Sequence, residues 1–173
     1  MASCRSFSRC KLFGFSFVIF ATVGTQLPFP RLMTILDRAA GELGLEIIAQ
    51  TCEPLGTYRY LTERESLSPR EFDNLIARTD RIVGHAGVGT ILSARKAGKP
   101  AILFPRRASF GEHRNEHQLA TVSSLGRRDG FHIAWHEDEL RALITMPSLP
   151  APESDQSPTR AKMIQKLRSF MVS

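Results

Sequence analysis

The chain has 173 residues, of which 42% are hydrophobic and 23% are charged, as in ordinary globular proteins. This composition excludes fibrous, collagen-like and wholly disordered proteins, and the length predicts one domain or two at most. The three cysteines form no CxxC pair and no histidine stands at metal-ligand spacing from them, which argues against a disulfide framework and a zinc ribbon. We expect a reducing, cytoplasmic setting.

The formal net charge of +6 predicts attraction to an anion, whether nucleic acid, anionic lipid or a phosphorylated ligand. Basic residues are spread along the chain, with clusters only in the loop 106–114 and in the C-terminal segment 160–168. No known nucleic-acid-binding motif accompanies them, so we expect no nucleic acid as a partner.

The N-terminus combines basic residues with a later apolar run, an order that also occurs in secretory signals. The apolar run covers residues 12–23, which is too short to span a bilayer as a helix of about 20 residues. An A-x-A cleavage site is also missing. We therefore expect a buried first strand over 17–23 and a disordered N-terminal extension over 1–16.

After this strand, the chain alternates between helical and strand-like patterns. Apolar residues at i, i+3, i+4 and i+7 predict a helix over 32–43, and Gly44 ends it. A second strand is expected over 45–51. The polar segment 53–67 fits no element.

The same alternation continues to residue 144. Ser68, Pro69 and Glu71 form a capping box that predicts a helix over 69–78. The other expected elements are strands at 81–84, 101–105 and 132–135 and helices at 90–97, 115–125 and 137–144. This order predicts an α/β, Rossmann-like domain over 17–146, with a mostly parallel sheet and helices on both faces.

Two further segments follow the predicted domain. Four prolines make residues 147–158 an expected extended linker. Residues 159–173 have the pattern of a basic amphipathic helix, which can lie on a membrane, bind a partner or pack back on its own sheet.

Ligands of open parallel sheets bind at the carboxyl ends of the strands, where three loops of unusual composition are expected. The loop 85–90 is rich in glycine, so the backbone N–H groups at the following helix start can approach a pyrophosphate. Alternatively, these glycines only permit positive φ angles or close packing. The loops 24–26 and 106–118 are expected at the same edge.

The loop 106–118 offers many hydrogen-bonding side chains suited to sugar hydroxyls, although alone it also resembles a solvated, charged helix start. His113 and His117 could share a helix face, but without a third ligand we expect no metal site. Neither GxGxxG nor a P-loop GK[ST] occurs, which disfavours NAD and ATP. An NAD-dependent enzyme would use an acidic residue near the second strand, where Glu53 stands.

Five ordered segments carry a family resemblance: FATVGTQLPF at 20–29, GHAGVGT at 84–90, GKP at 98–100, PRR at 105–107 and GEHRNEHQL at 111–119. Together they resemble the C-terminal, donor-binding domain of family 28 glycosyltransferases. The similarity is greatest to stand-alone forms of that domain, such as the catalytic subunit of the two-subunit GlcNAc transferase of dolichol-linked oligosaccharide synthesis and bacterial exopolysaccharide subunits. It implies half of a GT-B enzyme that uses a UDP-sugar without a metal or other cofactor and inverts the anomeric centre.

The resemblance also implies roles for individual residues. The donor diphosphate would be bound by Gly87, Val88, Gly89 and Thr90. The donor sugar and nucleotide would be bound by Ser93, Arg107, Glu112, Asn115, His117 and Gln118, and the acceptor-side loop would be Gly24, Thr25 and Gln26. Ser93 replaces a glutamate that binds the ribose in many members, and Glu112 or Glu116 could compensate.

The implied reaction needs a base for the acceptor hydroxyl. His85 is a candidate because an imidazole has a suitable pKa, although it could instead shape the turn, and a partner could supply the base. The resemblance implies a membrane-anchored, acceptor-binding partner subunit, a lipid-pyrophosphate-linked acceptor, and a cytoplasmic protein held at the inner face of the membrane by that partner.

Two functions are therefore expected as alternatives. The first is hexosyl transfer in exopolysaccharide biosynthesis, with a glucuronosyl or N-acetylglucosaminyl donor among the options; the adjacent Arg106 and Arg107 suit a carboxylated sugar or a phosphate. The second is a non-catalytic subunit that binds a nucleotide-sugar, which the serine at position 93 and the missing acceptor half would favour.

Overall fold

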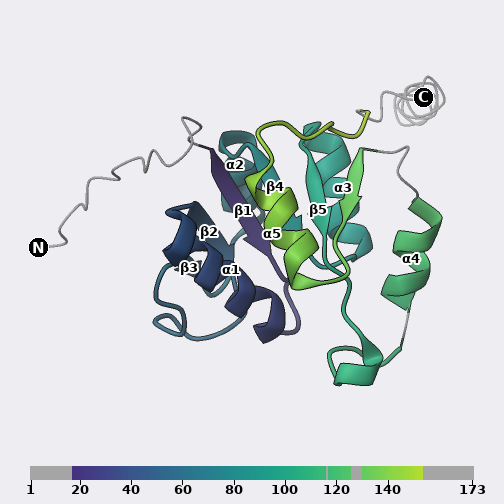
Figure 1. Ribbon diagram of the computed structural model, residues 1–173, viewed down its shortest axis with the longest axis horizontal. Helices are drawn as coiled ribbons and strands as arrows, with labels where there is room; N and C mark the ends of the chain where they lie inside the picture. Colours follow the sequence, from purple (N-terminus) through teal and green to yellow (C-terminus); the bar gives the residue numbers. More distant parts are fainter. Residues whose placement is uncertain (1–16, 116, 126–129, 154–173) are drawn as a thin grey trace, which may run out of the picture.

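The structure is a computed structural model that describes residues 17–115, 117–125 and 130–153. Within these ranges, strands and helices alternate around one sheet (Figure 1). The strands are β1 (Val18–Thr22), β2 (Glu46–Gln50), β3 (Thr62–Arg64), β4 (Arg81–Gly84), β5 (Ala101–Leu103) and β6 (Phe131–Ile133). The helices are α1 (Pro30–Leu43), α2 (Pro69–Arg78), α3 (Val88–Ala97), α4 (His117–Leu125) and α5 (Glu137–Thr145), with a 3-10 turn at Ala108–Phe110.

The strand order determines where a ligand can enter the fold. The strands lie in the order β3-β2-β1-β4-β5-β6 and all neighbours are parallel. The chain builds outward from β1 to β3 and then returns to place β4 on the other side of β1, which makes a topological switch point between β1 and β4. In the register, Thr22 lies level with Gln50 of β2 and Gly84 of β4. The predicted Rossmann-like α/β fold is confirmed.

The apolar run near the N-terminus forms the central strand β1. The side chains of Ile19, Phe20 and Ala21 are fully buried, and β1 pairs with β2 on one side and β4 on the other. A strand covered on both faces needs such a continuous apolar run, so the strand predicted over 17–23 is confirmed. Among the described residues, no helix has the length and apolar character needed to cross a membrane.

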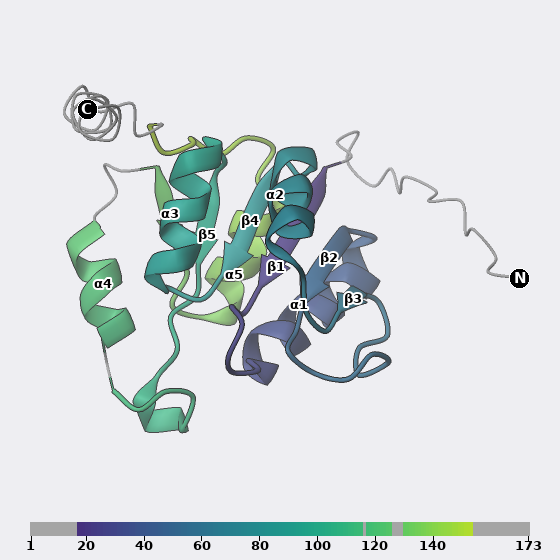
Figure 2. The same cartoon turned by 180° about the vertical axis from the view of Figure 1, so that it is seen from behind.

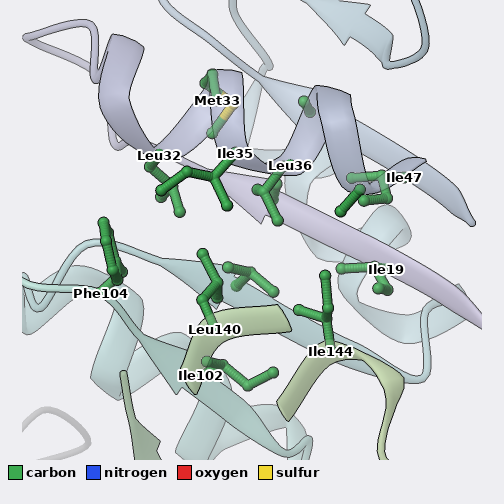
Figure 3. Close-up of a cluster of buried hydrophobic side chains, with 14 of the residues drawn as sticks. Ile19, Leu32, Met33, Ile35, Leu36, Ile47, Ile102, Phe104, Leu140 and Ile144 are labelled. Carbon is green, nitrogen blue, oxygen red and sulfur yellow. The ribbon is translucent and has the colours of Figure 1, made fainter. Parts of the chain in front are cut away.

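Helices cover both faces of the sheet. α1 and α5 cover the face seen in Figure 1, and α2 and α3 cover the face seen in Figure 2. Leu36 of α1 and Leu140 of α5 belong to the same buried cluster as Ile102 of β5 (Figure 3). On the other face, Ile76 of α2 and Ile91 of α3 belong to a second cluster. The sheet therefore has a hydrophobic core on each side.

Several helix ends follow the signals that the sequence carries. The Glu71 backbone N–H donates to the Ser68 hydroxyl over 3.4 Å, and the Ser68 N–H donates to the Glu71 carboxylate over 2.9 Å, which is the predicted capping box. Gly44 and Gly98 follow α1 and α3 with φ angles of 63° and 59°, where glycine avoids the strain of a Cβ.

Two expectations about local structure were wrong. The unassigned segment 53–67 contains the edge strand β3, which pairs with β2; its three polar residues have no apolar alternation to reveal it. Helix α4 begins at His117, so His113 lies in the preceding loop and the two histidines do not share a helix face. The other element boundaries shift by a few residues.

The chain after α5 packs against the domain as far as it is described. Leu149 and Pro152 are buried, and the His132 Nε2 atom lies 2.9 Å from the Pro150 carbonyl oxygen. Gly130 has a φ angle of +69°, and a Cβ there would lie 2.4 Å from the Ala151 backbone. The predicted extension over 1–16, the rest of the predicted linker and the predicted helix over 159–173 lie outside the described residues.

Leu140→Ala should lower the free energy of unfolding by about 2–5 kcal/mol, because Leu140 is fully buried in the cluster of Figure 3. Urea denaturation followed by circular dichroism measures this change. Leu92→Ala is the control, since the Leu92 side chain is 55% exposed and its truncation should change the stability by no more than about 0.5 kcal/mol. Equal losses in the two variants would contradict this core.

Candidate functional site

A cavity of about 450 Å³ opens at the carboxyl ends of β1 and β4. Thr22 and Gln50 line it, and the Thr22 hydroxyl donates to the Gln50 side-chain oxygen over 2.9 Å. The β1–α1 loop, the turn into α3 and the loop between β5 and α4 also contribute residues. The structure thus brings the three loops together at the switch point, where ligands of parallel sheets bind.

The start of α3 faces this cavity with unused hydrogen-bond donors. Gly87 is the N-cap residue and provides no side-chain hydrogen bond, and the first turn contains no acidic residue. The first N–H groups of a helix have no partner within the helix, and the helix dipole favours an anion beside them. Gly89 and Thr90 of this turn line the cavity. The arrangement suits a phosphate group.

Glycine occurs at the positions around this turn for different physical reasons. A Cβ at Gly84 would lie 2.8 Å from the Thr22 carbonyl oxygen, and a Cβ at Gly87 would lie 2.2 Å from His85 Nε2. Gly24, with a φ angle of +86°, would place a Cβ 2.9 Å from His85 Cε1. Packing therefore explains these three glycines. A Cβ at Gly89 would meet nothing within 4 Å, so at Gly89 packing leaves open space that a ligand can use.

His85 lies between the β1–α1 loop and the α3 turn and lines the cavity. Burial and the positive charge of Arg106 lower its pKa to about 4, although a hydrogen bond with the Thr22 backbone acts in the opposite direction. The imidazole is therefore neutral at pH 7. Its Nδ1 atom is buried without a hydrogen-bond partner, so one ring nitrogen is left unsatisfied beside the cavity.

The side chains of the two adjacent arginines of the β5–α4 loop line different cavities. Arg106 is 3% exposed and lines the cavity. The Arg107 guanidinium donates to the Trp135 carbonyl oxygen over 2.9 Å, and Arg107 lines a second cavity of about 420 Å³ beside α1 and α5. Arg107 therefore does not reach the cavity at the switch point.

Glu112 is bound within the protein. Its carboxylate accepts hydrogen bonds from the Arg31 guanidinium over 2.5 Å and 2.8 Å and from the Arg107 N–H over 2.9 Å. Burial acts to raise the pKa of Glu112, but these hydrogen bonds and the charges of Arg31 and Arg106 outweigh it and lower the pKa. Glu112 therefore remains ionised and fixes the loop to α1.

Asn115, His117 and Gln118 make hydrogen bonds at the start of α4. The Asn115 side-chain oxygen accepts the His117 backbone N–H over 3.2 Å and lies 3.2 Å from His113 Nδ1. Gln118 is buried, and its side-chain oxygen accepts the Arg106 N–H over 3.0 Å. Of these residues, His113 and Gln118 line the cavity.

The residues that the sequence singled out are thus divided. Those that line the cavity are Gly24, Thr25, Gln26, His85, Gly89, Thr90, Ser93 and Gln118. Those that do not are Gly87, Val88, Arg107, Glu112, Asn115 and His117, and their assignment to donor binding stays a prediction. Within the described ranges, no three His, Cys, Asp or Glu side chains lie close enough together to hold a metal ion.

The sequence reasoning missed the α2 side of the cavity. Leu67, Pro69 and Phe72 line it there, and Asp73 follows them. They were missed because the edge strand β3, which leads to this position, was not assigned. Glu53, the acidic residue considered for a ribose, instead accepts a hydrogen bond from the Tyr58 hydroxyl over 2.6 Å.

Comparisons with known proteins agree with this architecture. A family model described as the glycosyltransferase family 28 C-terminal domain matches residues 58–168, whereas comparison with curated proteins finds no match. The solution structure of ALG13 has a TM-score of 0.58 and 17% identity, with 86% of this chain and 94% of that chain covered. MurG of Acinetobacter baumannii has a TM-score of 0.57 and 20% identity, with 76% and 41% covered. The glycotransferase of kitacinnamycin has a TM-score of 0.55 and 16% identity, with 98% and 42% covered.

Identities this low show a shared fold, here that of the C-terminal domain of GT-B glycosyltransferases. The chain spans about two-fifths of the length of MurG and of the kitacinnamycin protein, but nearly all of the ALG13 chain. The family model covers well over half of the chain. By that match, the protein belongs to the glycosyltransferase family 28 C-terminal domain family.

Proposed function

We propose that the protein is the donor-binding subunit of an inverting glycosyltransferase that transfers a hexosyl residue from a UDP-sugar to a lipid-pyrophosphate-linked acceptor in exopolysaccharide biosynthesis. The observation that carries the proposal is the start of α3. Its N–H groups have no side-chain cap, its glycine at position 89 is free of packing constraints, and it opens on a cavity at the switch point. These features support diphosphate binding.

The remaining walls of the cavity suit the other parts of a nucleotide-sugar. Leu67, Pro69 and Phe72 present apolar surface on the α2 side, against which a uracil ring can pack. Ser93 lies one turn after Gly89 on α3 and offers a hydroxyl to the ribose. Gln118 and His113 stand on the other side with groups that can bind sugar hydroxyls.

The transfer itself needs two kinds of help. The acceptor oxygen attacks the anomeric carbon, the bond from that carbon to the UDP oxygen breaks, and a base takes the proton of the acceptor hydroxyl. The α3 start and the charge of Arg106 would stabilise the departing UDP without a metal ion. His85 is our candidate base, because it is neutral at pH 7 and borders the cavity.

The acceptor side is proposed to come from a second protein. MurG and the kitacinnamycin protein are more than twice as long as the part of them that this chain matches. The ALG13 chain has nearly the same extent as this one. We propose a membrane-anchored partner that binds the lipid-linked acceptor and holds this subunit at the cytoplasmic face. A non-catalytic, nucleotide-sugar-binding subunit is the second candidate, favoured by the serine at position 93.

Gly89→Asp should weaken UDP binding at least about fivefold, because it places a negative charge where the diphosphate is expected, and a like-charge pair costs at least about 1 kcal/mol. A Cβ at position 89 meets no atom within 4 Å, so we expect little change in stability. Calorimetric titration with UDP measures the affinity. Ala142→Asp adds the same charge to an exposed site on α5 and should bind UDP normally. A failure of wild-type protein to bind UDP would overturn the proposed donor site.

Transfer should require both the protein and its partner. Radiolabelled UDP-glucose, UDP-N-acetylglucosamine and UDP-glucuronate are each incubated with membranes that contain a co-expressed candidate partner, with and without this chain. We expect label in the lipid fraction with one donor and only when both proteins are present. UDP binding without lipid labelling by any donor would favour the non-catalytic subunit.

His85→Gln should lower kcat by about 10²–10⁴-fold, the usual contribution of a general base. In wild-type protein, kcat/KM should be constant near neutral pH and fall as the pH approaches 4, because the pKa of His85 is about 4 and protonation removes the base. Initial rates across this pH range measure both effects. Circular dichroism at each pH checks that the protein stays folded. Full activity of His85→Gln would assign the base to the partner.

A further inference from the structure

We propose that Arg106 is a positioning residue whose buried guanidinium ties the β1–α1 loop to the β5–α4 loop and thereby sets the shape of the cavity. The importance of Arg106 for the reaction rests on the proposed function, whereas the hydrogen bonds that connect the two loops involve only residues of this chain. The sequence predicts Arg106 as a ligand for a carboxylated sugar or a phosphate, whereas in the structure its guanidinium binds backbone carbonyl oxygens.

The guanidinium of Arg106 donates to backbone carbonyl oxygens on both sides of the cavity. In the β1–α1 loop, it donates to the Val23 carbonyl oxygen over 3.2 Å and to the Leu27 and Pro28 carbonyl oxygens over 2.7 Å each. In its own β5–α4 loop, it donates to the Glu112 carbonyl oxygen over 3.4 Å. The acceptors in the two loops lie more than eighty residues apart in the sequence, so one side chain connects two segments that are distant along the chain.

Two further contacts extend this connection. The guanidinium lies over the ring of Phe29, 4.4 Å from its centroid, and Phe29 is the fully buried N-cap residue of α1. The Arg106 backbone N–H donates to the Gln118 side chain in the first turn of α4. Arg106 therefore connects the start of α1, the β1–α1 loop and the start of α4.

Arginine suits this position better than lysine does. A planar guanidinium has five N–H donors in fixed directions and can stack on an aromatic ring, whereas an ammonium has three donors on a flexible stem. The acceptors described for the Arg106 guanidinium are neutral carbonyls, and the nearby Glu112 carboxylate is bound to Arg31. The positive charge of Arg106 acts on the Glu112 carboxylate and, at the cavity, on His85.

The positive charge of Arg106 and its hydrogen bonds to the two loops have separable effects. Arg106 from the β5–α4 loop and His113 before α4 are the groups whose charges act on His85, and both disfavour its protonated form. Burial also disfavours that form. Removing the charge of Arg106 should therefore raise the pKa of His85, whereas replacing arginine by lysine should keep the charge but lose the hydrogen bonds that span the two loops.

Arg81 provides a matched control. It is also 3% exposed, donates to the Leu143 and Ile144 carbonyl oxygens, and lies over the Phe17 ring at 4.0 Å. It stands at the amino end of β4, opposite the cavity. Arg81→Gln should therefore destabilise the protein as Arg106→Gln does, without changing the loops or His85.

The test compares Arg106→Lys, Arg106→Gln and Arg81→Gln in the full chain without ligand. Amide hydrogen exchange of residues 23–28 and 108–115 should be at least about tenfold faster in both Arg106 variants, since hydrogen bonds from a charged donor are stronger than those from a neutral one and their loss favours local opening. The NMR titration of His85 should move to higher pH in Arg106→Gln and stay in place in Arg106→Lys. Arg81→Gln should leave both readouts at wild-type values.

Titration with UDP then tests whether the connection between the two loops matters for ligand binding. Both Arg106 variants should bind UDP at least about tenfold more weakly than Arg81→Gln. Unchanged loop exchange in folded Arg106→Lys would overturn the proposal, as would equal loop exchange in Arg81→Gln. If Arg106→Gln does not fold, the Lys variant decides. If wild-type protein binds no UDP, the proposed function fails, while hydrogen exchange and the His85 titration still decide the role of Arg106.

Discussion

The lateral pairing of β1 with β4 is the constraint on which the rest of the site depends. Gly84 lies level with Thr22, and a side chain at position 84 would collide with the Thr22 carbonyl oxygen. Only glycine therefore lets the two carboxyl ends stay together at this point. Because they do, the β1–α1 loop and the turn into α3 face each other across one opening, with His85 between them.

The positive charge of the chain is used partly inside the protein. Arg31 binds the Glu112 carboxylate, and Arg81 and Arg106 bind backbone carbonyl oxygens. Buried guanidinium groups of this kind satisfy several acceptors at once. The net charge of +6 is therefore a poor measure of the charge that an approaching anion meets, and backbone N–H groups at the start of α3 carry much of the proposed attraction.

Sequence patterns predicted most of the fold because the apolar runs, the capping box and the helix-ending glycines are local signals. The edge strand β3 escaped because three polar residues at the border of a sheet need no apolar alternation. The site was harder. Arg106 and Arg107 are neighbours of one type, yet one is buried at the cavity and the other binds Trp135. In an irregular loop, side-chain direction depends on tertiary contacts that sequence spacing does not encode.

The start of β1 and the segment that directly follows α5 lie at the end of the sheet that is away from the cavity (Figure 1). Phe17, at the start of β1, and Pro147–Leu149, after α5, line the same small hollow beside Arg81. Fluorophores or surface linkers attached near these two points would leave the mouth of the cavity unobstructed. The protein can thus be immobilised or labelled at the amino end of β1, while the end of the sheet that holds the cavity stays accessible.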